Sequence, residues 1–230
     1  MNGVLQDAVY FGAMISLASY GLGVLLKRKL KWAIINPLLV AIVVTILVLV
    51  VGRIDYATYN EGGKYISYLL TPATVCLAIP LYEQLSLLKK NWQAILAGIL
   101  SGTVASMLSI VLMAFLFGLS HEEYVTMLPK SITTAIGMGV AEELGGYVAI
   151  TAAVIIVTGI IGNMIAEIVF KCFKIEEPIA KGIALGTSAH AIGTAKALEL
   201  GEIEGAMSSL SIVVAGLFTV LGASIFAQLL

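Results

Sequence analysis

The chain has 230 residues, of which 60% are hydrophobic and only 12% are Asp, Glu, Lys or Arg, whereas soluble domains carry about 25% charged residues. The mean hydropathy of +1.02 excludes an ordinary soluble domain, because a chain of this length exposes too much surface to hide so many apolar side chains. The formal net charge of −1 gives no electrostatic basis for binding nucleic acid. The composition therefore predicts an all-α polytopic protein embedded in a lipid bilayer.

Five long stretches contain no charged side chain, and each is long enough to cross a hydrocarbon core of about 30 Å. Three further apolar stretches are short or interrupted, because 65–82 contains two prolines, 131–141 has 11 residues and 182–195 is rich in glycine. Unpaired backbone is tolerated at membrane depth only inside protein or beside water, so we expect these three to lie inside the molecule. The five long stretches are 8–26, 32–52, 91–120, 144–166 and 205–230.

Loop charge predicts the orientation, since cytoplasmic loops carry an excess of Lys and Arg. Basic residues cluster at 27–31, 89–90 and 171–181, and the connections between these clusters are mixed or acidic. The N-terminus is then outside and the C-terminus cytoplasmic. The acidic loop at His121 and the basic loop at Lys171 are expected on opposite sides of the membrane, so an odd number of crossings must join them. Because the stretch 144–166 supplies one crossing, we expect 127–143 to be a re-entrant or half-membrane element. The total is about seven crossings, two of them interrupted.

The order of the segments predicts an internal duplication. A long span, an interrupted one and a long one (32–52, 65–82, 91–120) recur as 144–166, 182–195 and 205–230. Because the first triplet begins inside and the second outside, the two form a 3+3 inverted repeat with two discontinuous crossing helices, as in many transporters. The alternative is that the alignment is fortuitous. We therefore expect one transmembrane domain, 1–230, with a leading span at 1–30, repeat 1 at 31–120, the re-entrant element at 127–143 and repeat 2 at 144–230.

The first interrupted segment carries Thr71, Pro72, Thr74 and Pro80. Each proline removes a backbone donor and clashes with the preceding turn, so we expect the helix to open between Pro72 and Pro80. An opening exposes the N–H groups of the following half-helix to an anion, and the two threonines add hydroxyl donors. The alternative is a simple proline kink with both threonines bonded to their own backbone.

The second interrupted segment contains His190, the one histidine expected inside the membrane. Ionisable groups there are costly and usually serve a cavity or a pathway, so we expect His190 to contact substrate or couple protons, the alternative being a structural hydrogen bond. Gly186 and Gly193 permit unwound backbone. Lys196 either faces the site or extends to the outer interface. The candidate hydroxyl donors of this segment are Thr187, Ser188 and Thr194.

A third polar region precedes the short glycine-containing stretch at 131–141. Its lysine, Lys130, would supply the counter-charge for a carboxylate, unless it is an ordinary interfacial lysine. Glu142 is a candidate for proton coupling if it is buried beside Lys130 or His190, and otherwise it is a helix-end residue. Ser131, Thr133 and Thr134 add hydroxyls next to Lys130.

No arrangement of a nucleophile with a base suggests an enzyme. No spacing of Cys, His, Asp or Glu predicts a metal site, and no motif predicts a cofactor. We therefore expect a protein that binds or carries a solute and catalyses no reaction.

Four motifs in order resemble the LrgB/CidB family of bacterial membrane proteins: TPATVCLAIPLYE (71–83), LPKSITTAIGMGVAEELGG (128–146), PIAKGIALGTSAHAIGTAKA (178–197) and GAMSSL (205–210). In that family a proline often follows the two threonines of the second motif, where this chain has Ala135, which weakens the case for Thr133 and Thr134. The resemblance implies a multi-pass protein of the bacterial inner membrane that acts with a separate, smaller LrgA/CidA-like membrane protein. It also implies an antiholin-like role in regulating murein hydrolases and lysis.

Related members of the family, including a plastid glycolate/glycerate translocator, move small monocarboxylates, and bacterial pairs are linked to pyruvate. We therefore weigh two functions. The first is a secondary transporter of small monocarboxylate anions, which uses the two broken segments. The second is a holin-type pore or regulator of wall hydrolases, which does not need them. A homodimer or higher homo-oligomer is a further expectation, by analogy with other inverted-repeat carriers.

Overall fold

The computed structural model describes residues 10–30 and 36–230, and these are helical almost throughout, with no strand among them. The expected all-α class is confirmed for this part of the chain. Small parts of the expected spans 8–26 and 32–52 lie outside the described residues. The chain divides into two compact units, one ending at Cys76 and the other covering Leu77–Leu230. The single domain of 1–230 stays a prediction.

The first unit contains α2 (Phe11–Leu30), α3 (Pro37–Gly52), α4 (Tyr56–Ser67) and α5 (Leu70–Cys76). The Asn36 side chain caps α3 by accepting the N–H groups of Leu38 and Leu39, and Pro37 fits the first helical position because no donor is needed there. The hydroxyls of Ser16 and Tyr59 lie 2.8 Å apart and join α2 to α4.

The chain changes from one short helix to another at Leu77, between the two prolines of the first interrupted segment. Pro72 lies in the first turn of α5, and Pro80 lies in the first turn of α6 (Ala78–Glu83). A first-turn proline costs little, because its missing N–H would have no partner within the helix. By length and hydropathy, residues Tyr56–Glu83 still form one candidate membrane span. A discontinuous crossing helix at 65–82 therefore stays a prediction.

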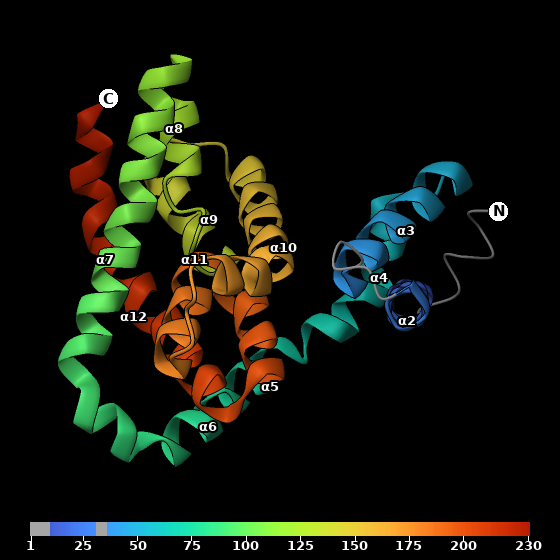
Figure 1. Ribbon diagram of the computed structural model, residues 1–230. Coiled ribbons are helices and arrows are strands. Elements are labelled where there is room, and N and C mark those ends of the chain that lie inside the picture. Colours follow the sequence, from blue (N-terminus) through green and yellow to red (C-terminus); the bar gives the residue numbers. More distant parts are fainter. Residues whose placement is uncertain (1–9, 31–35) are drawn as a thin grey trace. The chain divides into compact units, whose positions relative to one another are not determined.

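The second unit contains α6 together with three long apolar helices and the shorter elements between them (Figure 1). Among the described residues, four stretches are long and apolar enough to cross a membrane, namely Tyr56–Glu83, α7, α10 and α12 with its 3₁₀ extension. A multi-pass membrane protein is consistent with this finding, while the count of seven crossings stays a prediction. The elements are α7 (Leu85–Phe117), α8 (His121–Met127), α9 (Thr134–Glu143), α10 (Val148–Cys172), α11 (Pro178–Leu200), α12 (Glu202–Phe226) and η1 (Ala227–Leu229).

Residues 121–146 run inward along α8 and return along α9. A capping box between Ser120 and Glu123 begins α8, and the helix ends at Met127. Gly146, just after α9, lies against Thr126 near the end of α8, so the chain returns to the level at which α8 ends. With 7 and 10 residues, these helices are about 10 and 15 Å long, too short to cross a bilayer. A half-membrane element at 127–143 stays a prediction.

The second interrupted segment reverses direction at His190, where φ is 41° and ψ is −135°. A straight helix of 23 residues would separate its ends by about 33 Å, yet Lys181 and Leu200 line one cavity of about 400 Å³. Gly193 also lies against the backbone carbonyl of Leu185, whereas a straight helix would hold these residues about 12 Å apart. The element α11 is therefore a hairpin, with a first arm at 178–189 and a second arm at 191–200.

This reversal corrects the expected interrupted crossing at 182–195. The chain returns to the end of the unit at which the first arm began, because the left-handed backbone of His190 turns it back. The two arms then pack side by side on α12, where Thr194 in the second arm bonds Ser208 at 2.7 Å and Gly186 in the first arm lies against the same serine. The acidic loop at 199–204 therefore lies at the same end of the unit as the basic loop at 171–181.

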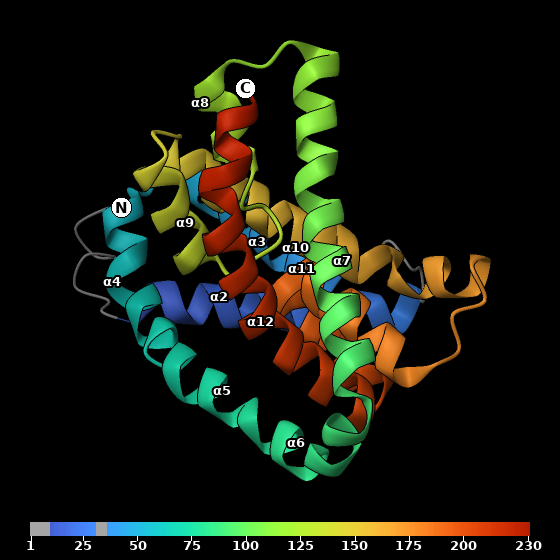
Figure 2. The same cartoon turned by 90° about the vertical axis from the view of Figure 1, so that its left-hand side faces the viewer.

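The two hairpins enter the unit from opposite ends of α10. Near the start of α10, the Thr151 hydroxyl donates to the Thr126 carbonyl of α8 at 2.9 Å. Near its other end, Glu167 pairs with Lys196 in the second arm of α11 at 2.6 Å. A helix of 25 residues is about 37 Å long, so these contacts mark opposite ends. The C-terminal end of α12 lies beside α8 (Figures 1 and 2), where the Tyr124 hydroxyl donates to the Phe226 carbonyl.

Gly186→Ala is expected to lower stability by about 1–3 kcal/mol, the usual cost of overpacking. A methyl group there would lie 2.5 Å from the Ser208 carbonyl oxygen and 2.6 Å from Ser211 Cβ. Thermal unfolding of the detergent-purified protein checks this. Gly139→Ala is the matched control, because nothing lies within 4 Å of its added methyl group. Equal melting temperatures for the two variants would contradict the close α11–α12 packing.

Candidate functional site

The turn between α8 and α9 presents Lys130 and Ser131 at the inner tip of its hairpin. Pro129 is among the fully buried residues of the protein, and the turn closes when the Lys130 N–H donates to the Met127 carbonyl at 3.1 Å. Thr133 then adopts an extended backbone and starts α9. The rigid turn leaves the half-buried Lys130 side chain directed toward α7.

Lys130 is held by two hydroxyl groups. Its Nζ donates to Ser106 Oγ on α7 and to Ser131 Oγ, each at 3.1 Å. The two serine hydroxyls are themselves 2.9 Å apart. Among the described residues, no carboxylate forms an ion pair with Lys130. An ammonium group surrounded only by neutral partners attracts an anion, because each of its contacts leaves the positive charge uncompensated.

A cavity of about 820 Å³ leads to this lysine between α7 and the first arm of α11. Its walls carry small residues, such as Gly98 and Gly102 on α7, and hydroxyl groups from both sides. Glu177, the other charged residue on the wall, is the N-cap of α11 at the opposite end of the first arm. The cavity is large enough for a small organic solute. Its hydroxyl donors and acceptors are Ser101, Ser106, Ser131, Thr187 and Ser188.

A second cavity of about 400 Å³ reaches Lys130 from the other side of the first arm. It lies between that arm and α10, with mostly apolar walls that include Ile161, Ile165 and Phe170. Lys130 and Ser188 border both cavities. The first arm of α11 is therefore flanked by cavities on two sides, with the lysine at the inner end of each.

His190 is buried and faces α10. Its Nε2 lies 2.9 Å from the Ile155 carbonyl oxygen, and because a carbonyl only accepts, Nε2 carries the hydrogen. His190 lines neither of the two cavities that meet at Lys130. The geometry therefore fits the structural alternative considered for this histidine, and a direct contact with substrate stays a prediction.

The backbone of His190 predicts a stability difference between two substitutions. A φ of 41° is costly for a residue with a Cβ atom but not for glycine, by about 1–3 kcal/mol. His190→Ala removes the bond to Ile155 and keeps the strain, whereas His190→Gly removes both. We expect the glycine variant to melt at the higher temperature of the two in detergent solution. A lower melting temperature for the glycine variant would refute the assigned strain.

The structure brings together four of the residues singled out from the sequence, since Lys130, Ser131, Thr187 and Ser188 line one cavity. Their role in binding stays a prediction. Thr194 is instead buried between the His190 carbonyl and the Ser208 hydroxyl, which is a structural position.

The remaining candidates lie elsewhere. Thr133 and Thr134 begin α9 and do not line the cavity. Glu142 is exposed and, among the described residues, forms no ion pair with Lys130, so the condition for its proton coupling is not met. Thr71 is exposed in the first unit, and the Thr74 side chain lies outside the described part of the structure. The predicted crossing of the two interrupted segments therefore stays a prediction.

Ser106 is the residue of the site that sequence reasoning missed. It lies within the charge-free stretch 91–120, which was interpreted as an ordinary span. The available signal was its hydroxyl group inside an otherwise apolar stretch, together with Ser101 one and a half turns earlier. Both serines line the cavity.

Comparison with known proteins places this architecture in a family. A model of the LrgB-like family matches residues 16–229. The chain belongs to the LrgB family. It is 42% identical over 222 residues to the antiholin-like protein LrgB of Bacillus subtilis (strain 168), which covers 96% of each chain. It is also 42% identical over 212 residues to the protein of the same name from Bacillus cereus (strain B4264), which covers 92% of each. No solved structure matches this LrgB-family chain.

Proposed function

We propose that this protein is a secondary transporter of small monocarboxylate anions, of the pyruvate or glycolate type. The observation that carries the proposal is the Lys130 ammonium group at the inner end of the cavity, bonded to Ser106 and Ser131 but to no carboxylate of the described chain. A single fixed cation with hydroxyl neighbours complements one carboxylate and an adjacent oxo or hydroxyl group. The proposal involves no bond-making step, and we propose no enzymatic activity for this protein.

The arrangement of the two hairpins favours a carrier mechanism over a simple pore. They enter from opposite ends of the second unit, and α10 lies along both. Half-membrane elements that meet near the middle are the usual way to place backbone and polar groups in a transport site. The proposed site lies at the tip of one hairpin and beside the first arm of the other.

The proposed orientation follows from the basic residues near the ends of α11. If the loop at 171–181 is cytoplasmic, the larger cavity opens toward the cytoplasm and the C-terminal end of α12 is external. This is opposite to the expectation from the sequence, which counted 182–195 as a crossing. Thiol labelling of a cysteine added after Leu230, with an impermeant reagent on intact cells, distinguishes the two orientations.

An antiholin-like role is the second candidate, and the names of the similar Bacillus proteins favour it. In that case the protein would regulate murein hydrolases or permeability, together with an LrgA/CidA-like partner or as a homo-oligomer. Proteoliposomes that contain the purified protein separate the two functions. Transport predicts saturable uptake of labelled pyruvate that unlabelled glycolate competes away, with no leakage of an entrapped dye. Dye leakage without saturable uptake would favour a pore.

The same measurement is made with and without the LrgA-like protein in the membrane. Uptake by this chain alone would assign the transport site to it. Uptake that requires both chains would place the site, or its activation, in the complex.

A further inference from the structure

The two arms of α11 have different surroundings. The first arm borders the larger cavity through Ile183 and Thr187 and the smaller one through Leu185. It therefore has unfilled space on two sides near Lys130. Its third side packs closely on α12, where Gly186 lies against Ser208 and Ser211. Backbone contact through small residues makes the α11–α12 packing stiff.

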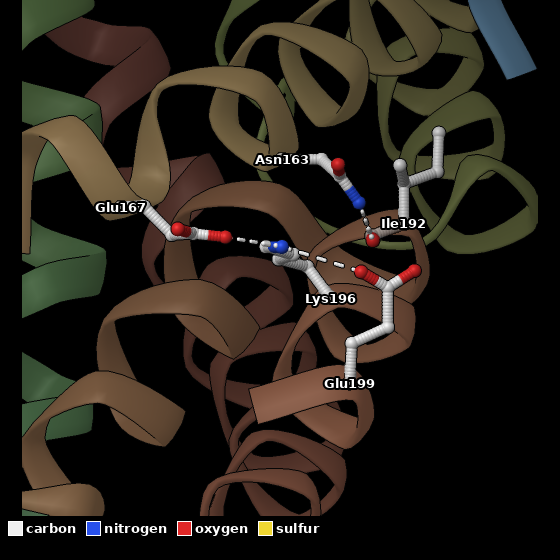
Figure 3. Close-up of polar contacts among 5 residues, drawn as sticks. All are labelled: Asn163, Glu167, Ile192, Lys196 and Glu199. Carbon is white, nitrogen blue, oxygen red and sulfur yellow. Dashed lines mark hydrogen bonds and ion pairs between the residues drawn. The ribbon is translucent and has the colours of Figure 1, made fainter. Parts of the chain in front are cut away.

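The second arm is fastened to α10 by polar side chains, which Figure 3 shows. Lys196 Nζ lies 2.6 Å from Glu167 Oε1 on α10. Asn163, one turn earlier on α10, donates to the Ile192 carbonyl oxygen at 3.0 Å. Lys196 also pairs with Glu199 of its own arm at 3.2 Å. Two groups on α10 thus hold the second arm, one near its tip and one near its middle, in addition to the His190–Ile155 bond at the tip itself.

The Glu167–Lys196 pair is partly open to its surroundings, since the glutamate side chain is 49% exposed and the lysine side chain 12%. An ion pair with an exposed carboxylate contributes little to stability, because the carboxylate regains its solvation when the pair separates. Lys196 keeps Glu199 as a partner after separation, and the half-exposed Glu167 side chain is open to solvation. The contact with α10 is therefore easier to break than the packing on α12.

We infer that the α11 hairpin is the gate of the carrier, and that the Glu167–Lys196 ion pair is the latch that holds this gate against α10. When the latch opens, the second arm separates from α10 while the hairpin keeps its packing on α12 and its His190–Ile155 bond, and the passage to Lys130 beside α10 widens. The inference rests on the proposed transport function, because it assigns the moving part of that transporter.

Cross-linking tests the gate. Cys76 and Cys172 are exposed and free, so both are first changed to serine. Glu167→Cys and Lys196→Cys are then combined in the full chain, and a short bifunctional thiosulfonate joins the two thiols in proteoliposomes. We expect at least a ten-fold loss of pyruvate uptake on cross-linking, recovery on reduction, and unchanged pyruvate binding in detergent. The matched control combines Lys196→Cys with Glu199→Cys, which joins two positions within one arm, and cross-linking it is expected to leave uptake unchanged.

The outcomes separate this inference from the proposed function. Uptake that is the same before and after the Glu167–Lys196 cross-link, in protein that transports pyruvate, overturns the gate and leaves transport standing. Wild-type protein that neither binds nor takes up pyruvate overturns the transport function itself.

A second measurement tests the latch without relying on uptake by the double-cysteine variant. Ser188 borders both cavities, so a Ser188→Cys reporter in the same background reports access to the site. We expect Glu167→Gln to raise the alkylation rate of this thiol by a maleimide at least three-fold, because the latch is weakened. Glu199→Gln is the control, since it leaves the contact with α10 intact. Equal rates in the two variants overturn the latch.

Discussion

Lys130→Met is expected to lower the initial rate of labelled pyruvate uptake by about 100-fold. Methionine keeps most of the length of the side chain but removes the positive charge that faces the cavity. A hydrogen bond to a charged group is worth about 1.5–3 kcal/mol, and about 2.7 kcal/mol corresponds to a factor of 100 at room temperature. A desolvated carboxylate without a cation would add to the loss. Uptake into proteoliposomes at a fixed protein-to-lipid ratio measures the effect.

Lys89→Met is the matched control for this substitution. Lys89 is exposed near the start of α7 and does not line the cavity, so uptake is expected to remain within two-fold of wild type. Lys130→Arg keeps the charge but changes the geometry of the donors, so we expect partial activity. If Lys130→Met transports as well as Lys89→Met, the anion binds elsewhere and the proposed site is wrong.

The fold class and the membrane setting were predictable because they depend on composition and on the length of apolar stretches. The short element around Lys130 was also accessible to sequence reasoning. A charge-free stretch of 11 residues at 131–141 is too short to cross a bilayer, whatever its neighbours are. This physical limit is the basis of the half-membrane expectation at 127–143, which stays a prediction, and the structure has two short helices in this region.

The reversal at His190 was not predictable from residue types. A hairpin with two arms and a continuous crossing need a similar number of apolar residues, so length does not separate them. Positive φ is expected of glycine, and three glycines lie in the segment, yet the chain turns at a histidine. What fixes the turn is tertiary, namely the bond from His190 to the Ile155 carbonyl and the packing of both arms on α12. The proposed orientation of the C-terminus differs from the sequence expectation because of the reversal at this one residue.

The position of Ser106 shows a second limit of prediction from the sequence. Its hydroxyl meets Lys130 only because the middle of α7 lies at the level of the α8–α9 turn, and sequence patterns do not set the register between two elements. Lys130 itself could be singled out as a cation in a polar tip, but its two hydroxyl partners and the absence of an ion pair in the described chain depend on packing. The residue types of the candidate site were therefore predictable from the sequence, whereas the geometry that brings them together was not.

Ala105→Trp is expected to lower pyruvate uptake at least 30-fold while the protein still folds. Ala105 is exposed on α7, lines the larger cavity and directly precedes Ser106. An indole ring at this position would occupy the space in front of Lys130 without entering the packed core. Because the cavity is the proposed route to the lysine, filling it blocks the solute by sterics and leaves every charge in place.

Val104→Trp makes the same change one residue earlier, at an exposed position that does not line the cavity. Successive residues on a helix point about 100° apart, so this second indole ring is directed away from the cavity, and uptake is expected to stay within two-fold of wild type. Both variants should elute as folded protein in size-exclusion chromatography and melt within a few degrees of each other. Equal uptake by the two would mean that the solute does not pass between α7 and the first arm of α11. If Ala105→Trp loses pyruvate uptake and Val104→Trp keeps saturable uptake, the solute passes through this cavity. Because both variants keep every charge, this result would be independent of the charge of Lys130.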